Sequence, residues 1–327
     1  MRDVARMAGV SAQTVSRYFK NPELIGLGNR ERIAKVVADT GYFPNPAAST
    51  LSANRTNLVA VIVPTIDHSI FSDAVAGLAQ TLEARNHGLM IATNGFSLKK
   101  EEQQVERFLA HKVAGIVLIG QHHGERTTRL LRASGTPTVE LLEIDNPPID
   151  IAIGLSNFAA ARDLTSRLIA LGRRRIGFIS APFNGNDRVQ RRLEGYKAAL
   201  KSGGLAFDPD LVATAEFRIE NGAKVFSKMY GDRPDIDAVI SNDILGLGVQ
   251  LQCARLGLAV PQDVAITGFD DLEVSSILDR KLTTVKISGF TMGTLAGEMI
   301  LERQSRDAGT PKVVDLGYEI LWRGTTP

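Results

Sequence analysis

The chain has 327 residues with a net charge of +2; 44% are hydrophobic, 23% charged and 6% aromatic. From this length we expect about two globular domains, and the scarcity of aromatic residues favours packed α/β layers over a β-sandwich. A single cysteine, Cys253, excludes an internal disulfide and a cysteine zinc cluster, and the longest apolar runs, such as Leu58–Val63, are too short to cross a bilayer. Because no signal-peptide pattern opens the chain, we expect a cytoplasmic protein with no membrane partner.

The first 57 residues differ in charge and pattern from the rest. They contain eight Lys or Arg and four Asp or Glu, a net charge of +4, which leaves −2 for the remaining 270 residues. Residues 1–45 show no strand pattern and predict three short helices, at Val4–Ala8, Ala12–Phe19 and Arg30–Thr40. A small basic helical unit on a near-neutral body is typical of a nucleic-acid-binding module.

The segment from Val4 to Arg17 predicts a helix-turn-helix. Gly9 supplies the tight turn and Ser11 caps the second helix, from which polar side chains point outward. Gln13 and Arg17 can read base edges in the major groove, where each good pair contributes about 1–3 kcal/mol of discrimination. Phosphate contacts are expected from Ser11, Thr14, Ser16 and Asn21. An αα-hairpin with solvated polar residues is the alternative interpretation.

From residue 58 onward, β-rich runs alternate with helical stretches, which predicts parallel sheets covered by helices. The strands are expected at Leu58–Val63, Leu89–Thr93, Val113–Ile119, Thr138–Leu142, Arg175–Ser180, Leu211–Ala215, Ala238–Ser241 and Val264–Phe269. The helices between them are expected at Phe71–Asn86, Lys100–His111, Phe158–Leu171, Asp187–Lys201 and Asp243–Leu256. Because these are many strands for one twisted sheet, we expect two lobes with a ligand cleft between them.

Polar residues gather where several of these strands end. Asn242 follows the strand Ala238–Ser241, Asp270 follows Val264–Phe269, and Arg192 lies on the helix after Arg175–Ser180. Ligands of parallel α/β sheets bind outside the carboxyl ends of the strands, so these residues are candidates for a binding site. Helix capping by Asn242 and Asp270, and a solvated Arg192, are the alternatives.

The run from Asp3 to Arg17 resembles the pattern D-V-A-x-x-A-G-V-S-x-x-T-V-S-R of the LacI/GalR family of bacterial transcriptional repressors. The resemblance continues through Arg30–Ile33, Gly41-Tyr42, Pro44-Asn45 and Arg55-Thr56 and extends over the whole chain. It implies an α/β protein with an N-terminal three-helix helix-turn-helix head and a hinge, followed by a two-lobed periplasmic-binding-protein-like body with parallel sheets. The implied domains are a head at 1–45, a hinge helix and linker at 46–57, and an effector-binding and dimerisation domain at 58–327.

The resemblance also implies roles for individual residues. Ala12, Gln13 and Arg17 would occupy base-reading positions, Asn45 would contact DNA, and Leu51 would wedge into the minor groove at the operator centre. Arg192, Asn242 and Asp270 would bind the effector, Phe71 would form an apolar wall, and Thr65 and Glu143 would line the pocket.

Three features depart from the family pattern. Only Met1-Arg2 precede Asp3, without the usual Ser/Thr cap, which predicts a weak start to the first helix. Gly26-Leu27 replace a Ser-rich cap of the third helix, and Ser49 lies where many relatives have arginine, so a phosphate contact and a hinge contact to DNA are in question.

Several segments look like those of gluconate-utilisation repressors: Phe19–Glu23, Val139–Leu141, Asp150–Gly154 with Asn157-Phe158, and Pro311-Lys312 with Asp315–Gly317. They favour a sugar acid such as gluconate or a ketogluconate, held through its carboxylate by Arg192. Asp270-Asp271 depart from that branch, so an effector that is a neutral or phosphorylated sugar stays open.

The expected function is therefore an allosteric repressor of carbohydrate-metabolism genes that binds a pseudo-palindromic operator as a homodimer. A sugar-binding transport protein and a sugar-metabolising enzyme are the rival classes. We expect no enzymatic activity, cofactor or metal. His122-His123-Gly124 predicts a loop rather than a metal site. Gly246-Leu247-Gly248 lies in a helix rather than after a strand, so it is not a dinucleotide-binding fingerprint.

Overall fold

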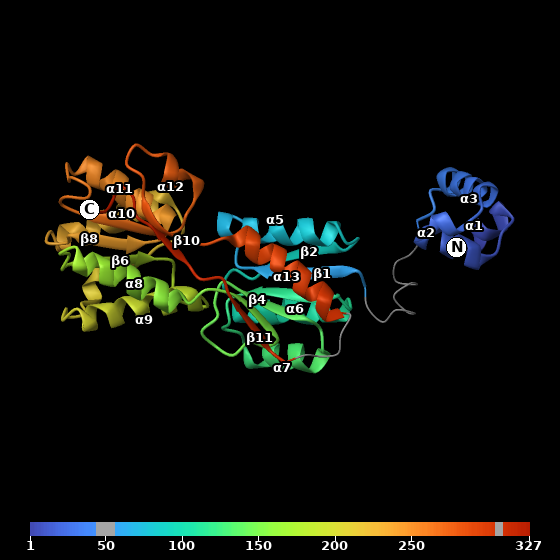
Figure 1. The fold of residues 1–327 in the computed structure, drawn as a ribbon, viewed down its shortest axis with the longest axis horizontal. Coiled ribbons are helices and arrows are strands. Elements are labelled where there is room, and N and C mark those ends of the chain that lie inside the picture. Colours follow the sequence, from blue (N-terminus) through green and yellow to red (C-terminus); the bar gives the residue numbers. More distant parts are fainter. Residues whose placement is uncertain (44–55, 305–309) are drawn as a thin grey trace. The chain divides into compact units, whose positions relative to one another are not determined.

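The computed structural model describes residues 1–43, 56–304 and 310–327 (Figure 1). The chain divides into two compact units, Met1–Thr56 and Asn57–Pro327. The predicted hinge residues Asn45 and Leu51, together with Ser49, lie outside the described residues. None of the helices in the described ranges combines the length and apolar character needed to span a bilayer.

The N-terminal unit contains the helices α1 (Arg2–Ala8), α2 (Ala12–Lys20), η1 (Pro22–Leu24) and α3 (Leu27–Thr40). Gly9 ends α1 with φ of 63°, a left-handed conformation that glycine adopts without steric cost, and the Ser11 hydroxyl caps α2 by accepting the Thr14 N–H at 3.0 Å. Val4, Ala5, Ala8, Val15 and Ile33 form the buried core.

In the N-terminal unit, two of the predicted helix starts were too late. Helix α1 begins at Arg2 and α3 at Leu27, although neither has a side-chain cap. In α3 the backbone N–H groups of Asn29 and Arg30 bond back to the carbonyl of Gly26, so the backbone itself closes the first turn.

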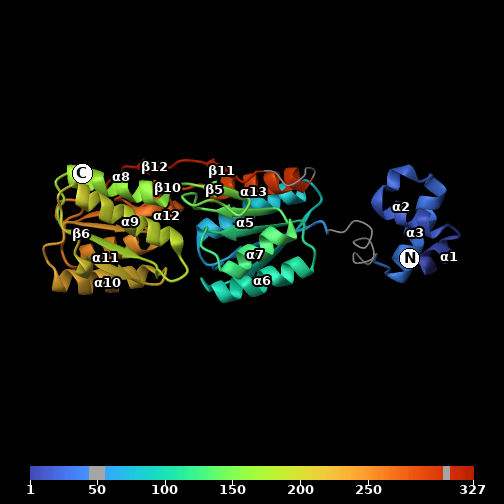
Figure 2. The same ribbon diagram turned by 90° about the horizontal axis from the view of Figure 1, so that it is seen from below.

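The larger unit has two lobes, each with a six-stranded sheet (Figures 1 and 2). The first sheet has the order β11-β5-β4-β3-β1-β2, with strands β1 (Leu58–Val63), β2 (Gly88–Thr93), β3 (Gly115–Ile119), β4 (Thr138–Leu141), β5 (Ile151–Gly154) and β11 (Lys312–Asp315). The second has the order β12-β10-β9-β8-β6-β7, with strands β6 (Ile176–Ser180), β7 (Val212–Thr214), β8 (Ala238–Ser241), β9 (Ala265–Asp270), β10 (Thr283–Lys286) and β12 (Glu319–Leu321). Pairing is parallel throughout the first sheet and in all of the second except β10 with β12.

Helices cover both faces of each sheet, which confirms the predicted two-lobed α/β body (Figure 2). The first lobe has α5 (Ser69–Glu83) and α13 (Gly289–Gln304) on one face and α6 (Leu98–Ala110) and α7 (Glu125–Ser134) on the other. The second lobe has α8 (Asn157–Ala170) and α9 (Asp187–Ser202) on one face and α10 (Ile219–Asp232) and α11 (Asp243–Arg255) on the other, with η2 (Pro209–Leu211) and α12 (Glu273–Ile277) in connections. The chain passes between the lobes after β5, after β10 and after β11.

Helix α13 was not predicted, because its sequence is rich in glycine and has low intrinsic helix propensity. Close packing of α13 against α5 compensates for this low helix propensity. A Cβ added to Gly293 would lie 1.9 Å from the carbonyl oxygen of Ala74, and one added to Gly77 would lie 2.1 Å from that of Phe290. The glycines therefore let the backbones of α5 and α13 approach each other more closely than side chains would allow.

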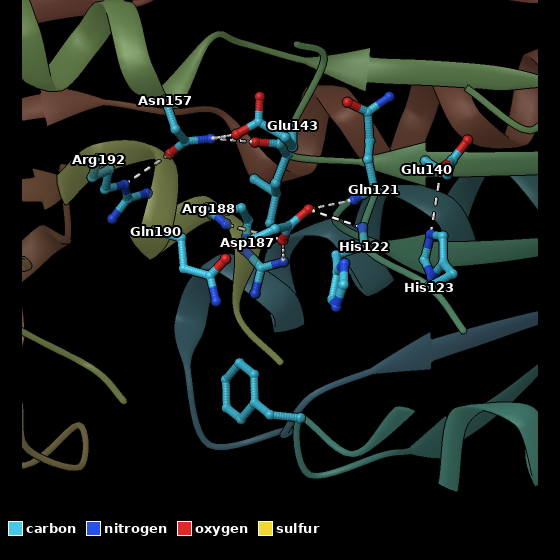
Figure 3. Close-up of polar contacts among 12 residues, drawn as sticks. Gln121, His122, His123, Glu140, Glu143, Asn157, Asp187, Arg188, Gln190 and Arg192 are labelled. Atoms are coloured by element: carbon cyan, nitrogen blue, oxygen red, sulfur yellow. Dashed lines mark hydrogen bonds and ion pairs between the residues drawn. The ribbon is translucent and has the colours of Figure 1, made fainter. Parts of the chain in front are cut away.

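A buried charged group holds the loop that follows β3. His123 Nδ1 lies 2.8 Å from Glu101 Oε1 on α6, and Nε2 lies 3.3 Å from Glu140 Oε1 on β4 (Figure 3). Burial lowers the pKa of His123, but the bonds to the two carboxylates outweigh it and raise the pKa to about 10. The segment is a loop, as predicted, and no group of three potential metal ligands occurs among the residues that the structure describes.

Replacing His123 with alanine should lower the free energy of unfolding at pH 7 by about 3–5 kcal/mol, because two buried carboxylates lose their cation. The stabilisation by His123 is fully present below its unfolded pKa and is lost as pH rises toward 10, so the difference between wild type and variant should shrink over that range. Urea unfolding of wild type and variant at pH 7 and pH 9.5 measures this difference in the free energy of unfolding. The exposed neighbour His122, replaced in the same way, is the control; equal losses at both positions would contradict this account.

Candidate effector cavity and DNA-binding head

The predicted DNA-reading residues lie on the exposed face of α2. Ala12, Gln13 and Arg17 are exposed, whereas Val15 on the opposite side is fully buried. Gln13 and Arg17 are four positions apart and therefore neighbours on one helical face. Of the predicted phosphate-contacting residues, Ser11 and Asn21 are exposed, and Thr14 and Ser16 are half-buried.

A cavity lies between the two lobes of the larger unit, at the carboxyl ends of β6, β8 and β9. The first lobe contributes His68, Ile70, Phe71 and Leu142, and the second contributes Phe178, Ile179, Ser180, Ala181, Asn186, Arg188, Val189, Arg192, Phe217, Ile240, Ser241, Asn242, Phe269 and Asp270.

Arg192 is held on three sides. Its Nε donates to Asn157 Oδ1 at 2.7 Å, its guanidinium carbon lies 4.0 Å from the centroid of the Phe269 ring, and Nη2 is 3.7 Å from Asp270 Oδ1. Burial lowers the pKa of Arg192, and Asp270 acts in the opposite direction. An arginine remains a cation even so, so the cavity contains a fixed positive charge with a carboxylate beside it.

Asp270 and its surroundings carry backbone strain. Asp270 has φ of 105° and Asp271 φ of 53°, in the left-handed half of conformational space where non-glycine residues are uncommon. The Asp270 carboxylate also lies 3.5 Å from His68 Nε2 in the first lobe. Burial lowers the pKa of His68, so its ring is neutral at pH 7. Strain of this kind concentrates at functional sites.

Several polar atoms at the cavity are buried without a hydrogen-bond partner among the described residues. They are both ring nitrogens of His68, Asn186 Oδ1, Arg188 Nη2 and Asn242 Nδ2. Asn242 caps α11, since its Oδ1 accepts the Leu245 N–H at 2.8 Å. Its amide Nδ2 remains an unused hydrogen-bond donor. Buried polar groups are nearly always satisfied, so a concentration of open donors and acceptors indicates a polar ligand.

The structure brings Phe71, Arg192, Asn242 and Asp270 together around the cavity and leaves Thr65 and Glu143 outside its lining. Thr65 Oγ1 accepts the Asp67 N–H within its own turn. Glu143 accepts the backbone N–H groups of Ile144 and Asp145 and, at 3.1 Å, the Asn157 amide (Figure 3). Because Asn157 in turn accepts from Arg192, Glu143 positions Arg192 through Asn157.

Sequence reasoning missed eight polar or aromatic residues of the lining: His68, Phe178, Ser180, Asn186, Arg188, Phe217, Ser241 and Phe269. Only Arg188 carried a usable signal, because it lies one helical turn before Arg192 on the same helix. His68 and Phe217 come from connections whose position the sequence pattern does not determine.

Asp187 connects the two lobes beside the cavity. Its Oδ2 accepts the backbone N–H groups of Gln121 at 2.6 Å and His122 at 3.1 Å, both in the first lobe (Figure 3). Its Oδ1 accepts from Arg188 Nη1 at 3.0 Å. One carboxylate therefore links the first-lobe loop after β3 to a cavity arginine on α9.

Two protein-family models match the chain. Bacterial regulatory proteins of the lacI family match residues 1–45, and a periplasmic binding protein-like domain matches residues 165–326. The chain is 31% identical to the HTH-type transcriptional regulator GntR of Escherichia coli (strain K12), over 98% of this chain and 96% of that protein. It is 29% identical to the HTH-type transcriptional regulator IdnR of the same strain, over 100% and 98%.

Solved structures give the same result. A LacI-family transcriptional regulator from Silicibacter pomeroyi has a TM-score of 0.90 at 28% identity, with 99% of this chain and 98% of that chain covered. The lac repressor dimer bound to operator and the anti-inducer ONPF shares the fold, with a TM-score of 0.84 at 22% identity over 99% and 98%. The chain belongs to the LacI family of bacterial regulatory proteins and is a transcriptional repressor of that family, whose named relatives are regulators rather than enzymes.

Glu143 gives this site a measurable pH dependence. Burial raises the pKa of Glu143 to about 7, so the stability it contributes is present below its unfolded pKa and is lost as pH rises through 7, by at most about 3 kcal/mol. In Glu143→Gln, the free energy of unfolding should fall less between pH 5 and pH 8 than in wild type. Urea unfolding at several pH values measures the slope, with the exposed carboxylate Glu125→Gln as control. A wild-type slope in Glu143→Gln would contradict the assignment.

Proposed function

We propose that this repressor controls carbohydrate-metabolism genes and that a sugar acid bound in the cavity regulates its binding to operator DNA. The observation that carries the proposal is the cavity itself, where buried arginines and unpartnered polar atoms meet aromatic walls. Sugars and their acids present hydroxyl groups to such polar atoms and apolar C–H faces to such walls. We assign the protein a binding function and no catalytic one.

The charge of the cavity favours an anionic effector. Its described lining contains two arginines, Arg188 and Arg192, and one carboxylate, Asp270. With His68 neutral, this leaves a net charge of +1, which a monoanionic sugar acid balances. A neutral sugar would leave the buried charge uncompensated, and a phosphate ester would add a second negative charge.

In this proposal residues 1–45 bind DNA, residues 46–57 form the hinge with Leu51 as the minor-groove wedge, and residues 58–327 bind the effector and dimerise. A homodimer would place two heads on a pseudo-palindromic operator. The edge strand β2 supports an interface between two copies of this unit. Parallel sheets are normally buried, yet Ile91 on this strand is 51% exposed. A coupling of about 1–3 kcal/mol between cavity and operator gives a 5- to 150-fold change in DNA affinity.

Replacing Arg17 with alanine should weaken binding to the operator about 5- to 150-fold, because an arginine–guanine pair provides ~1–3 kcal/mol of discrimination. Binding to random DNA should change little. The operator is first selected from a random-sequence DNA pool with the full chain, and affinities are then measured by fluorescence anisotropy. Arg129→Ala, an exposed arginine on α7, is the control. Unchanged operator affinity in Arg17→Ala would overturn the assigned reading face, and selected sequences without twofold symmetry would overturn the homodimer on its operator.

The effector class is tested by thermal unfolding with gluconate, a ketogluconate, glucose and glucose 6-phosphate. An effector present at a hundred times its Kd should add about 2.7 kcal/mol to the free energy of unfolding. We expect this from gluconate or a ketogluconate and expect Arg192→Ala to abolish it, whereas Lys201→Ala, an exposed residue at the end of α9, should not. Stabilisation by glucose or its phosphate alone would overturn the sugar-acid proposal.

A further inference from the structure

We propose that Arg188, rather than Arg192, binds the carboxylate of the effector, and that Arg192 and Asp270 together bind its hydroxyl groups. This inference rests on the proposed function and assigns the two ends of the ligand within the cavity. It differs from the sequence-based expectation, in which Arg192 holds the carboxylate.

Arg188 is a buried cation with an open donor. It lies in the first turn of α9 and is 5% exposed. Its Nη1 donates to Asp187 Oδ1 at 3.0 Å, whereas its Nη2 is buried without a hydrogen-bond partner among the described residues. The guanidinium carbon also lies 5.9 Å from the centroid of the Phe71 ring. A buried charge with an unsatisfied donor is unfavourable until an acceptor, best an anionic one, occupies the position beside it.

Arg192 is less suited to an anion because Asp270 is already next to it. A ligand carboxylate on Arg192 would lie close to the Asp270 carboxylate, which is 3.7 Å from Arg192 Nη2, and the two like charges would repel each other. A hydroxyl group avoids this conflict, since it donates to the Asp270 carboxylate while it accepts from the Arg192 guanidinium. The open Asn242 Nδ2 and Asn186 Oδ1 offer a donor and an acceptor for further hydroxyl groups.

The carboxylate next to Arg188 does not create the same conflict. Asp187 is absent from the cavity lining, and its two oxygens already accept from Arg188 and from the backbone N–H groups of Gln121 and His122. The backbone N–H groups of the first-lobe loop therefore stabilise the negative charge of Asp187, and Asp187 is not part of the surface that the ligand contacts. Asp187 fixes one edge of the Arg188 guanidinium and leaves the other edge for the effector.

The experiment compares aldonates with the matching alditols, which differ only in a carboxylate replaced by a hydroxymethyl group. Isothermal titration calorimetry with gluconate and glucitol, galactonate and galactitol, and mannonate and mannitol measures the preference of wild type for the acid. Arg188→Gln should lose aldonate affinity about 10- to 100-fold, the range for a charge-assisted hydrogen bond, with little change in alditol affinity. Arg192→Gln should weaken both members of a pair alike.

Arg188→Lys keeps the charge and should retain part of the preference for the acid, which provides a second test if the glutamine variant fails to fold. Lys201→Gln, outside the cavity on the same helix, is the matched control. If Arg188→Gln keeps the preference for the acid and Arg192→Gln loses it, the inference is wrong while the proposed function stands. If wild type binds none of the aldonates, the sugar-acid function fails and the inference fails with it.

Discussion

Asp187 receives hydrogen bonds from both lobes, and the arrangement of the cavity depends on this one carboxylate. Its Oδ2 accepts two backbone N–H groups of the loop after β3, and its Oδ1 orients Arg188. The loop is itself held by His123 between Glu101 and Glu140. A charged group in the interior of the first lobe is therefore connected, through one loop and one carboxylate, to an arginine at the cavity.

The cavity combines groups that are fixed with groups that are left open. Glu143, Asn157 and Phe269 fix Arg192, while Asn242 spends one side-chain atom on the cap of α11. The remaining buried donors and acceptors lower the stability of the protein without a ligand, and a polar ligand that satisfies them recovers that stability. These open atoms belong to both lobes, His68 to the first and Asn186, Arg188 and Asn242 to the second, so a ligand that satisfied all of them would contact both lobes.

In the head, the residues that form the core and the predicted DNA-reading residues lie on opposite sides of the same short helix, α2. Val15 is fully buried in a small apolar core, whereas Gln13 and Arg17 on the same helix are exposed. Substitution on the exposed face can therefore change DNA reading without removing core contacts. In the larger unit the candidate side chains Asn242 and Asp270 are buried, and Asn242 also has a structural role because it caps α11.

The sequence by itself determined what depends on local spacing. The helix-turn-helix follows from Gly9, the Ser11 cap and the apolar pattern around them, and buried strands such as β1 and β8 are readable as continuous apolar runs followed by polar strand ends. For that reason the strand-end pattern was enough to identify Arg192, Asn242 and Asp270 as candidates. Only the tertiary structure decided which side chains meet across the chain: the glycine-rich α13 on α5, His123 between Glu101 and Glu140, and Arg188 with a free edge toward the cavity. These contacts join segments distant in sequence, and no local propensity encodes which partner each side chain will find once two lobes have packed together.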